Sequence, residues 1–343
     1  MASEQPGQIL FTGFEGTRLP ADLAELIGQG RIGGVVLFAR NLCDPEQVRS
    51  LVDELHDRAP SSAPLTVAID QEGGRVQRLR APWTEWPPMR RLGERDSIDD
   101  TRAVARALGR ELADLRVDLN FAPVVDVDTN PDNPVIGDRS FSRNAEDVGR
   151  HAAAFVEAIQ DQGVAACAKH FPGHGDTAVD SHFELPRIDH DLERLRSVEL
   201  PPFRAAVEAG VAAVMTAHIL MSKLNREVPA TFARESLELL RGEVGFTGLV
   251  FADDFEMAAI ADRFPPEVGT RAALEAGVDS VLVCKRSDLR DRVLAALEAS
   301  EDTLLAPALE HVAAFKGRHS GGRFAAGGTP PYPEHQELAE RLR

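Results

Sequence analysis

The feature of this sequence that most constrains its fold is a regular alternation of short apolar runs with longer amphipathic stretches. Eight runs rich in valine and isoleucine have the length and composition of buried strands, at residues 8–14, 34–38, 65–69, 119–122, 165–170, 213–218, 249–253 and 280–283. Eight stretches with helical periodicity lie between and after them, at residues 20–28, 45–58, 101–115, 145–162, 191–209, 235–244, 266–276 and 287–299. We therefore predict an α/β fold with a parallel sheet, in which each crossover carries one helix.

The number of these units favours a single (β/α)8 barrel of the TIM type over a doubly wound sheet, and 343 residues suit a barrel with insertions. A dinucleotide-binding sheet would need a Gly-x-Gly-x-x-Gly turn after its first strand, and FTGFEGTRLP does not supply it. We expect the catalytic barrel to cover residues 1–318. Residues 319–343 begin with the Gly- and Pro-rich HSGGRFAAGGTPPYP, which predicts an irregular tail before a short terminal helix.

The charge balance excludes two classes of partner. The chain has 55 acidic against 38 basic residues, a net charge of −17, which repels both a nucleic acid backbone and an anionic membrane. No run approaches the ~18 apolar residues of a membrane span, and the start has no basic segment followed by an apolar one. We expect a cytoplasmic protein with no nucleic acid and no membrane partner. Cys43, Cys167 and Cys284 lie far apart without metal-site spacing, and we expect buried thiols.

Ionisable residues stand at the carboxyl ends of four predicted strands. In a barrel these ends gather at one face, where the chemistry of this fold is found. A charge that begins where a strand leaves the core would explain any one of these residues, but together they predict a site. They are Asp70, Lys169, His170, His218, Asp253 and Asp254.

The segment DQEGGRVQRLR follows the first of these strand ends. Gly73 and Gly74 allow a tight loop, and Arg75, Arg78 and Arg80 supply planar hydrogen-bond forks. A phosphate cradle is one interpretation, although the spacing is not that of a P-loop and no lysine follows the glycines. Arginine beside aspartate also suits the hydroxyl and carboxylate contacts of a sugar site.

The segment KHFPGHGDTAVDSH, residues 169–182, has three interpretations. In the first, its histidines and aspartates bind a metal, but the His-x-His pair common in metal-dependent barrel hydrolases is missing from QILFTGFEG. In the second, Asp180 orients His182 for proton transfer near neutral pH. In the third, these are solvated loop residues. The candidate metal ligands are His170, His174, Asp176, Asp180 and His182.

VFADDFEM places two adjacent carboxylates, Asp253 and Asp254, at a strand end. Side chains alternate along extended backbone, so we expect only one of them to face the barrel axis and the other to cap a helix or hold a neighbour. The inward aspartate has three open roles: a nucleophile that attacks a sugar carbon, a metal ligand, or a helix N-cap.

With these motifs in view, the chain resembles glycoside hydrolase family 3, in its bacterial β-N-acetylglucosaminidase branch associated with cell-wall recycling. The motifs occur in family order: GRIGGVVLFARN, DQEGGRVQRLR, NFAPVVDVDTNPDNPVIGDRSFS, KHFPGHGDTAVDSH, VMTAHI, FADDFEM and AGVDSVLVC. KHFPGHGDT with a downstream DSH is highly specific, whereas ADD alone is weak. The resemblance implies a single barrel that cleaves a non-reducing terminal β-linked N-acetylglucosamine from muropeptides with retention, through a covalent glycosyl-enzyme.

The resemblance also implies roles for individual residues. Asp253 corresponds to the nucleophile, and His182 to the general acid/base with Asp180 as its orienting partner. The family needs no metal or other cofactor, and we expect a monomer. Positions that match the family's sugar-binding residues are Asp70, Arg78, Arg139, Lys169 and His170.

Five alternatives stay open. A retaining glycosidase usually uses two carboxyl groups ~5–5.5 Å apart, and here the acid is a histidine, with an ordinary pKa of ~6.5. A neutral histidine repels inorganic phosphate less than a carboxylate does, so an N-acetylglucosaminide phosphorylase using the same residues is an alternative. Substrate assistance by the 2-acetamido group is another. From other classes, a metal-dependent barrel hydrolase, a Schiff-base lyase using Lys169 and a non-catalytic sugar-binding protein are retained. Beside the phenylalanines the chain has only Trp83, Trp86 and Tyr332 as aromatic platforms, which predicts a short pocket for one sugar.

Overall fold

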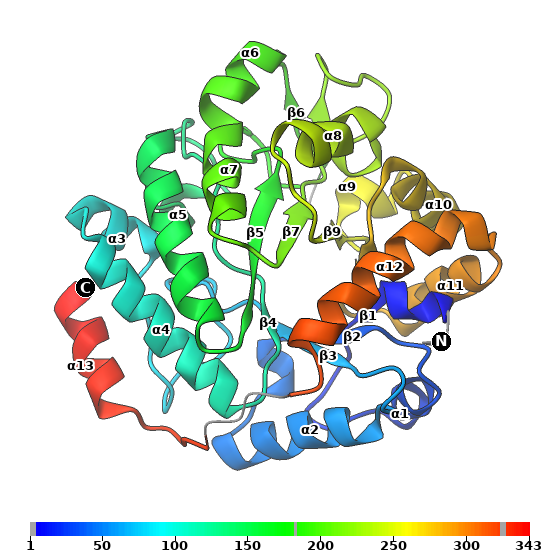
Figure 1. Cartoon of the computed structure of the whole chain (residues 1–343), viewed down its shortest axis with the longest axis horizontal. Coiled ribbons are helices and arrows are strands. Elements are labelled where there is room, and N and C mark those ends of the chain that lie inside the picture. Colours follow the sequence, from blue (N-terminus) through cyan, green and yellow to red (C-terminus); the bar gives the residue numbers. More distant parts are fainter. Residues whose placement is uncertain (1–4, 182–183, 323–326) are drawn as a thin grey trace.

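The protein is a closed barrel of eight parallel strands in a computed structural model, which describes residues 5–181, 184–322 and 327–343 (Figure 1). The strands are hydrogen-bonded in the order β1, β10, β9, β7, β5, β4, β3, β2, back to β1. All eight lie within or overlap the predicted strands, so the predicted (β/α)8 barrel is confirmed. Their bounds are β1 Leu10–Thr12, β2 Gly34–Leu37, β3 Thr66–Ile69, β4 Leu119–Asn120, β5 Ala165–Phe171, β7 Ala213–Thr216, β9 Leu249–Asp254 and β10 Ser280–Val283.

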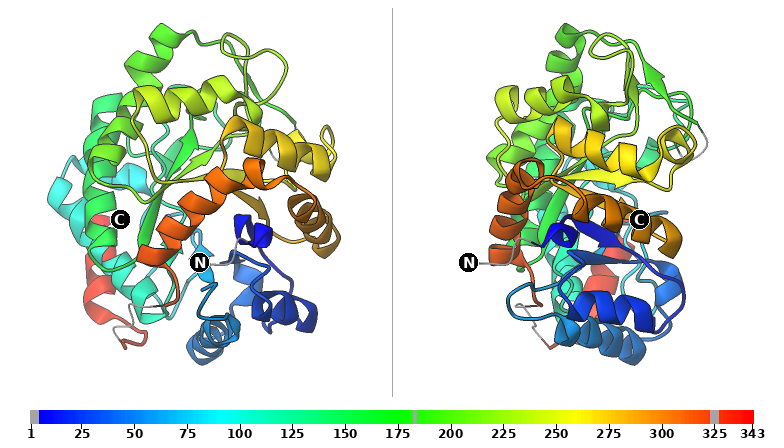
Figure 2. Two further views of the ribbon diagram at one scale, coloured as in Figure 1. Left: turned by 45° about the vertical axis from the view of Figure 1, so that its right-hand side comes forward. Right: turned by 90° about the vertical axis from the view of Figure 1, so that its right-hand side faces the viewer.

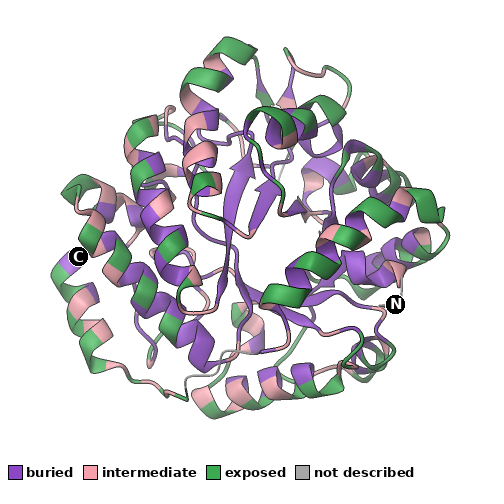
Figure 3. Cartoon of the chain, viewed as in Figure 1, coloured by how far each residue is buried: buried purple, intermediate pink, exposed green. Residues whose placement is uncertain are grey.

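The helices surround the barrel with their buried faces toward the strands and their exposed faces outward (Figures 2 and 3). None of the described helices is long and apolar enough to cross a membrane. The helices are α1 Ala21–Gly28, α2 Pro45–Arg58, α3 Met89–Arg95, α4 Ile98–Asp114, α5 Ala145–Gln160, α6 Leu192–Arg194, α7 Leu200–Glu208, α8 Arg234–Glu238, α9 Ala258–Ala261, α10 Pro266–Ala276, α11 Ser287–Glu298, α12 Asp302–His319 and α13 Pro333–Leu342.

Helix α2 shows how the local sequence fixes these elements. Asp44 accepts a hydrogen bond from the backbone N–H of Gln47, and Pro45 occupies the first turn, where no backbone donor is required. Val48 and Leu51 are buried at helical spacing, whereas Ser50 between them is exposed. The cap sets where the helix begins, and the apolar stripe packs it on the barrel.

Several elements and one cysteine differ from the sequence-based expectation. The β3–β4 crossover carries two helices, α3 and α4, so the expectation of one helix in each crossover is wrong. Helix α12 was not predicted, because Pro307 lies inside it and alanines occupy its buried and its exposed side. A separate two-stranded sheet pairs β6 (Arg187–Ile188) with β8 (Leu220–Met221) outside the barrel. Cys43 is exposed, contrary to the expected burial of all three thiols, whereas Cys167 and Cys284 are buried.

The interior of the barrel is filled by inward side chains from successive strands. Phe251 on β9 is fully buried, and its ring makes edge contacts with Phe11 at 4.9 Å and with Phe121 at 5.3 Å between centroids. Val312 and Phe315 of α12 belong to the same apolar cluster, so this helix closes one end of the barrel. Because side chains of a strand alternate, Phe251 below the site predicts an inward direction for Asp253, two residues further on.

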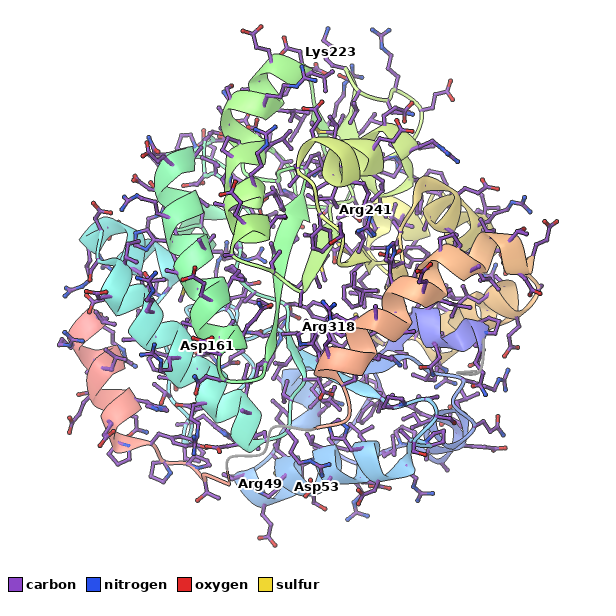
Figure 4. The ribbon with its side chains drawn as sticks, in the orientation of Figure 1. Arg49, Asp53, Asp161, Lys223, Arg241 and Arg318 are labelled. Carbon is purple, nitrogen blue, oxygen red and sulfur yellow. The ribbon has the colours of Figure 1, made fainter. Side chains whose placement is uncertain are left out.

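The chain after α12 packs back on α4. The backbone N–H of Gly328 and the hydroxyl of Tyr332 both donate to the carboxylate of Asp114, at 2.9 and 3.1 Å. Arg49 on α2 donates to the backbone oxygens of Asp114 and Gly328, and Figure 4 labels it near one end of α2. The described part of residues 319–343 is therefore fixed to the barrel by hydrogen bonds.

Candidate active site

A cavity of about 210 Å³ lies at the carboxyl end of the barrel strands. It brings together the sugar-binding residues and the nucleophile that the sequence analysis named, from strands β5 and β9 and from the loops that follow β3 and β4. These are Asp70, Arg78, Arg139, Lys169, His170 and Asp253. A larger cavity of about 530 Å³ lies at the other end, under α12, and does not contain these residues.

Asp70 and Lys169 form the centre of the polar side of the cavity. Lys169 Nζ donates to Asp70 Oδ1 at 2.8 Å, and Arg78 Nη2 donates to Asp70 Oδ2 at 3.2 Å. Burial alone would raise the pKa of Asp70, but the charges of Lys169 and Arg78 outweigh it and lower that pKa. Burial likewise opposes the charge on Lys169, and its carboxylate neighbours raise its pKa. Both groups are therefore charged at neutral pH.

Glu72, which the sequence analysis did not select, lies beside this pair. Arg139 donates two parallel hydrogen bonds of 2.8 Å to the Glu72 carboxylate, and Lys169 Nζ lies 2.7 Å from Glu72 Oε1. Burial would raise the pKa of Glu72, but Arg139 and Lys169 reverse that effect and hold the pKa well below its usual range. The cavity therefore has a network of three cations and two carboxylates on one side.

The tight turn predicted at Gly73 and Gly74 is present, with φ of +99° and +58°, and it places the three following arginines differently. Gly73 and Val76 form a bridge with reciprocal backbone hydrogen bonds of 3.2 Å. Arg78 borders the cavity. Arg75 pairs with Asp138 and Arg80 with Glu85 at the surface, so these arginines do not form a common phosphate cradle.

His170 is held by Asp126, a second residue that the sequence analysis did not select. The ring Nδ1 lies 2.7 Å from Asp126 Oδ2, and the other oxygen, Oδ1, accepts the backbone N–H of His174 at 2.6 Å. Burial opposes ionisation of Asp126, but the charge and hydrogen bond of His170 lower its pKa. The pairing of β5 with β7 shifts register between Lys169 and Phe171, and both Lys169 and His170 border the cavity.

The candidate metal ligands that the structure describes are engaged with other protein groups. His174 Nδ1 lies 2.7 Å from Thr177 Oγ1, and its Nε2 lies 3.3 Å from Ser181 Oγ. Burial, together with the charge of His170, lowers the pKa of His174 to about 4. Asp176 contacts His190 at 3.0 Å. Within the described ranges, no three histidine, cysteine or acidic side chains are grouped to hold a metal ion.

The proposed acid/base pair is placed only in part. His182 lies outside the described residues. Asp180 is described and half-buried but does not border the cavity, whereas the next residue, Ser181, does. The backbone oxygen of Ser181 accepts the N–H of Ala259 at 3.2 Å, which attaches this part of the loop to the start of α9. The roles predicted for Asp180 and His182 stay predictions.

Asp253 and Asp254 both border the cavity, although we expected only one to do so. Asp253 Oδ1 accepts the backbone N–H of Asp254 at 2.8 Å, and α9 begins only at Ala258, so Asp253 is not a helix cap. Asp254 Oδ1 accepts the N–H groups of Glu256 and Cys284, at 3.0 and 3.3 Å. Burial, then the charges of Glu256 and Asp253, raise the pKa of Asp254 to about 7.

His218, the remaining strand-end residue, does not border the cavity. Its Nε2 lies 3.1 Å from the backbone oxygen of Asp254, to which the ring donates. This hydrogen bond helps to hold the backbone of Asp254 in place.

Apolar side chains also line the cavity, among them Phe38. Phe38 lies under the guanidinium groups of Arg40 and Arg78, at 4.3 and 5.3 Å from the ring centroid. Both tryptophans and the one tyrosine lie elsewhere in the described structure. The cavity is below the ~300 Å³ at which pockets for drug-sized ligands begin, which agrees with space for one sugar.

Sequence signals for the residues we did not select are present but weak. Glu72 is two residues after a strand-end aspartate, and Asp126 follows β4 within VVDVDTN. Both are acidic residues just beyond strand ends. Their partners, Arg139 and His170, are however 67 and 44 residues away in the chain, and a local sequence pattern does not predict contacts at that distance.

Known proteins match this chain in sequence and in structure. Residues 3–314 match the family described as "Glycosyl hydrolase family 3 N terminal domain". A β-hexosaminidase of Thiobacillus denitrificans is 43% identical over 290 residues, 82% of this chain and 80% of the relative. A glycoside hydrolase family 3 β-N-acetylglucosaminidase from a Paenibacillus species has a TM-score of 0.93 at 39% identity, covering 100% of this chain and 68% of that one. NagZ from Neisseria gonorrhoeae, solved with N-trifluoroacetyl-D-glucosamine, has a TM-score of 0.84 at 33% identity and 97% coverage of both chains.

Proposed function

The chain belongs to glycosyl hydrolase family 3 and is a β-N-acetylhexosaminidase, and we propose that it acts by retention on peptidoglycan fragments. In this proposal it removes non-reducing terminal β-linked N-acetylglucosamine from muropeptides in the cytoplasm. The similarity to a NagZ solved with an N-acylated glucosamine supports the choice of sugar.

The observation that carries the proposal is the position of Asp253 in a one-sugar cavity whose other side is a charged, hydrogen-bonding network. Asp70 and Lys169 hold each other at 2.8 Å, and each keeps further hydrogen-bonding capacity for hydroxyl groups. Charged donors and acceptors in fixed positions select the hydroxyl pattern of a sugar. The cavity thus combines a recognition surface with a carboxylate at the end of β9.

In the first step, a carboxylate oxygen of Asp253 attacks the anomeric carbon of the bound sugar. The bond between that carbon and the leaving-group oxygen breaks, and His182, oriented by Asp180, donates its proton to that oxygen. The product is an ester between Asp253 and the sugar. Apolar side chains such as Phe38 and Met257 at the cavity wall limit the access of water.

In the second step, neutral His182 accepts a proton from a water molecule that attacks the anomeric carbon. The ester bond breaks, and Asp253 returns to its carboxylate form with net retention of configuration. The neutral form of an acid/base histidine, with one unprotonated ring nitrogen, is available near pH 7 because the ordinary pKa of histidine is ~6.5.

The test uses intact-protein mass after incubation with 5-fluoro-N-acetylglucosaminyl fluoride, followed by peptide mapping. We expect one added sugar on Asp253. The Asp253→Ala variant should gain no mass and lose turnover of an aryl β-N-acetylglucosaminide while keeping its fold. Asp262→Asn, which changes an exposed aspartate at the end of α9, serves as the control and should label like the wild type.

Other outcomes would direct the assignment elsewhere. An adduct on a different residue would overturn the role of Asp253. Turnover without any adduct would favour assistance by the 2-acetamido group. Release of N-acetylglucosamine 1-phosphate when inorganic phosphate is present would favour a phosphorylase, and inactivation by a chelator would favour a metal-dependent hydrolase.

A further inference from the structure

We propose that Glu72 is the positioning residue that sets where Arg139 and Lys169 present their free donors to the sugar. This inference rests on the proposed function. It gives a task to a buried carboxylate that the proposed chemistry does not use.

Glu72 is almost completely buried, with 2% of its side chain exposed, and both its oxygens are engaged. Oε2 accepts from Arg139 Nε at 2.8 Å, and Oε1 accepts from Arg139 Nη2 at 2.8 Å and lies 2.7 Å from Lys169 Nζ. Its backbone N–H donates to Val76 at 2.9 Å, within the tight turn. The backbone that carries this carboxylate is therefore held in place by the hydrogen bonds of the turn.

The two cations come from different parts of the barrel. Lys169 lies on β5, and Arg139 ends the short helix Gly137–Arg139 in the loop after β4. Among the described residues, Glu72 is the carboxylate that pairs with both, whereas Asp70 pairs with Lys169 and Arg78. Arg139 Nη2 and Lys169 Nζ both lie within 2.8 Å of Glu72 Oε1. Without the negative charge of Glu72 between them, these two buried cations would repel each other strongly.

A count of donors shows what this arrangement leaves for a ligand. An ammonium group has three N–H bonds, and Lys169 uses one on Asp70 and one on Glu72. A guanidinium group has five, and Arg139 uses two on Glu72 and one on the backbone oxygen of Val135. One donor of Lys169 and two of Arg139 remain, and both side chains border the cavity. Glu72 thus fixes which donors stay free and where they point.

The informative substitution is Glu72→Gln, which keeps the shape and removes the charge. Its amide group would bring N–H bonds toward two cations and force them apart. We expect kcat/KM on an aryl β-N-acetylglucosaminide to fall about 10–100-fold, mostly through a higher KM, because displaced positioning groups commonly cost this much. Glu72→Asp keeps the charge on a shorter side chain and should recover part of the loss. Glu85→Gln, at a half-exposed glutamate of the same loop, is the matched control.

Deoxy substrates separate positioning from a merely structural role. The same enzymes are assayed on the parent glycoside and on its 3-, 4- and 6-deoxy analogues. One of these analogues lacks the hydroxyl bound by Arg139 or Lys169. On that analogue kcat/KM of the wild type should fall toward the value of Glu72→Gln, and the substitution should lower kcat/KM little further. A loss of general stability would instead impose the same fold-change on every substrate.

Two results would overturn the inference: wild-type KM in Glu72→Gln, or an equal penalty on all four glycosides. Thermal unfolding is recorded for each variant, and if Glu72→Gln does not fold, Glu72→Asp carries the same substrate comparison. If the wild type turns over none of the four glycosides, the proposed function itself fails and the inference falls with it. If the wild type is active and the substrate pattern is flat, only the role of Glu72 is lost.

Discussion

Asp254 gives the stability of this protein a pH dependence that its amide replacement should remove. Its carboxyl group is held between the backbone N–H groups of Glu256 and Cys284, beside the charge of Asp253. Burial first, and then the charges of Glu256 and Asp253, raise its pKa to about 7 from an ordinary 3.8. The folded protein therefore prefers the neutral acid over a pH range in which the unfolded chain carries the anion.

The sign and size follow from linkage. Below about pH 4 Asp254 is protonated in both the folded and the unfolded state, and it does not lower the free energy of unfolding. As the pH rises from there through the folded pKa, the unfolded chain ionises first, and the free energy of unfolding falls. The difference of about 3 pKa units, at ~1.4 kcal/mol each, gives about 4 kcal/mol of destabilisation above pH 7 as an upper bound. An asparagine keeps an oxygen for the two N–H groups and does not ionise. We expect the difference in free energy of unfolding between Asp254→Asn and the wild type to increase by about 2–3 kcal/mol, in favour of the variant, from pH 5 to pH 9.

The assay is urea unfolding of both proteins at pH 5 and pH 9, with the free energy of unfolding compared at each pH. Asp118, whose pKa burial also raises to about 7, is present in both proteins and cancels. Asp262→Asn, at an exposed aspartate, should follow the wild type at both pH values. A difference between Asp254→Asn and the wild type that does not change with pH would refute the reasoning.

Three further predictions test the surroundings of the site. Phe251→Ala removes the buried ring that fills the barrel below Asp253 and should lower the free energy of unfolding by about 3–5 kcal/mol, measured in urea. Asp126→Asn removes the charged partner of His170 and should lower kcat/KM about 10–100-fold, as expected for a charge-assisted hydrogen bond, with a changed pH–rate profile. Gly175→Ala would place a Cβ 1.8 Å from the backbone oxygen of Val127 and should cost at least about 1–3 kcal/mol by thermal unfolding.

Controls for these variants come from the same chain. Gly317, where an added Cβ meets nothing within 4 Å, should accept alanine without loss of stability. An Asp126→Asn enzyme with wild-type kcat/KM and pH profile would show that His170 does not depend on its carboxylate partner. A Phe251→Ala loss below about 1 kcal/mol would contradict the described packing of the barrel interior.

The architecture was predictable because apolar runs of strand length must be buried on both faces, and their alternation with helices leaves few topologies. The same geometry explains why Asp70, Lys169 and Asp253 could be selected together: the ends of parallel barrel strands meet at one rim. Glu72 was not predictable by that rule. It lies in a loop, where its backbone N–H is hydrogen-bonded to Val76 across the turn, and its position depends on that turn.

Helix α12 and the exposure of Cys43 show a second limit of sequence patterns. Alanine packs against a core or faces water with little penalty, so the alanines of α12 give no periodic signal, and Pro307 gives a misleading one. Cysteine is among the most buried residue types, but Cys43 stands in the short loop before α2, where the chain runs over the surface. Both outcomes depend on contacts that are distant in the chain.

The return of the last residues onto α4 has a practical consequence for protein engineering. The backbone N–H groups of Gly322 and Gly328 satisfy the buried carboxylates of Asp118 and Asp114, each at 2.8–2.9 Å, and His335 lies 2.8 Å from Glu111. A version shortened after α12 would expose α4 and remove these hydrogen bonds, which leaves Asp118 with Val67, Glu111 with Thr84 and Asp114 with Arg110 as partners. Such a truncation should yield less soluble product on expression and be cut faster by proteases, even though no residue near the substrate would have changed.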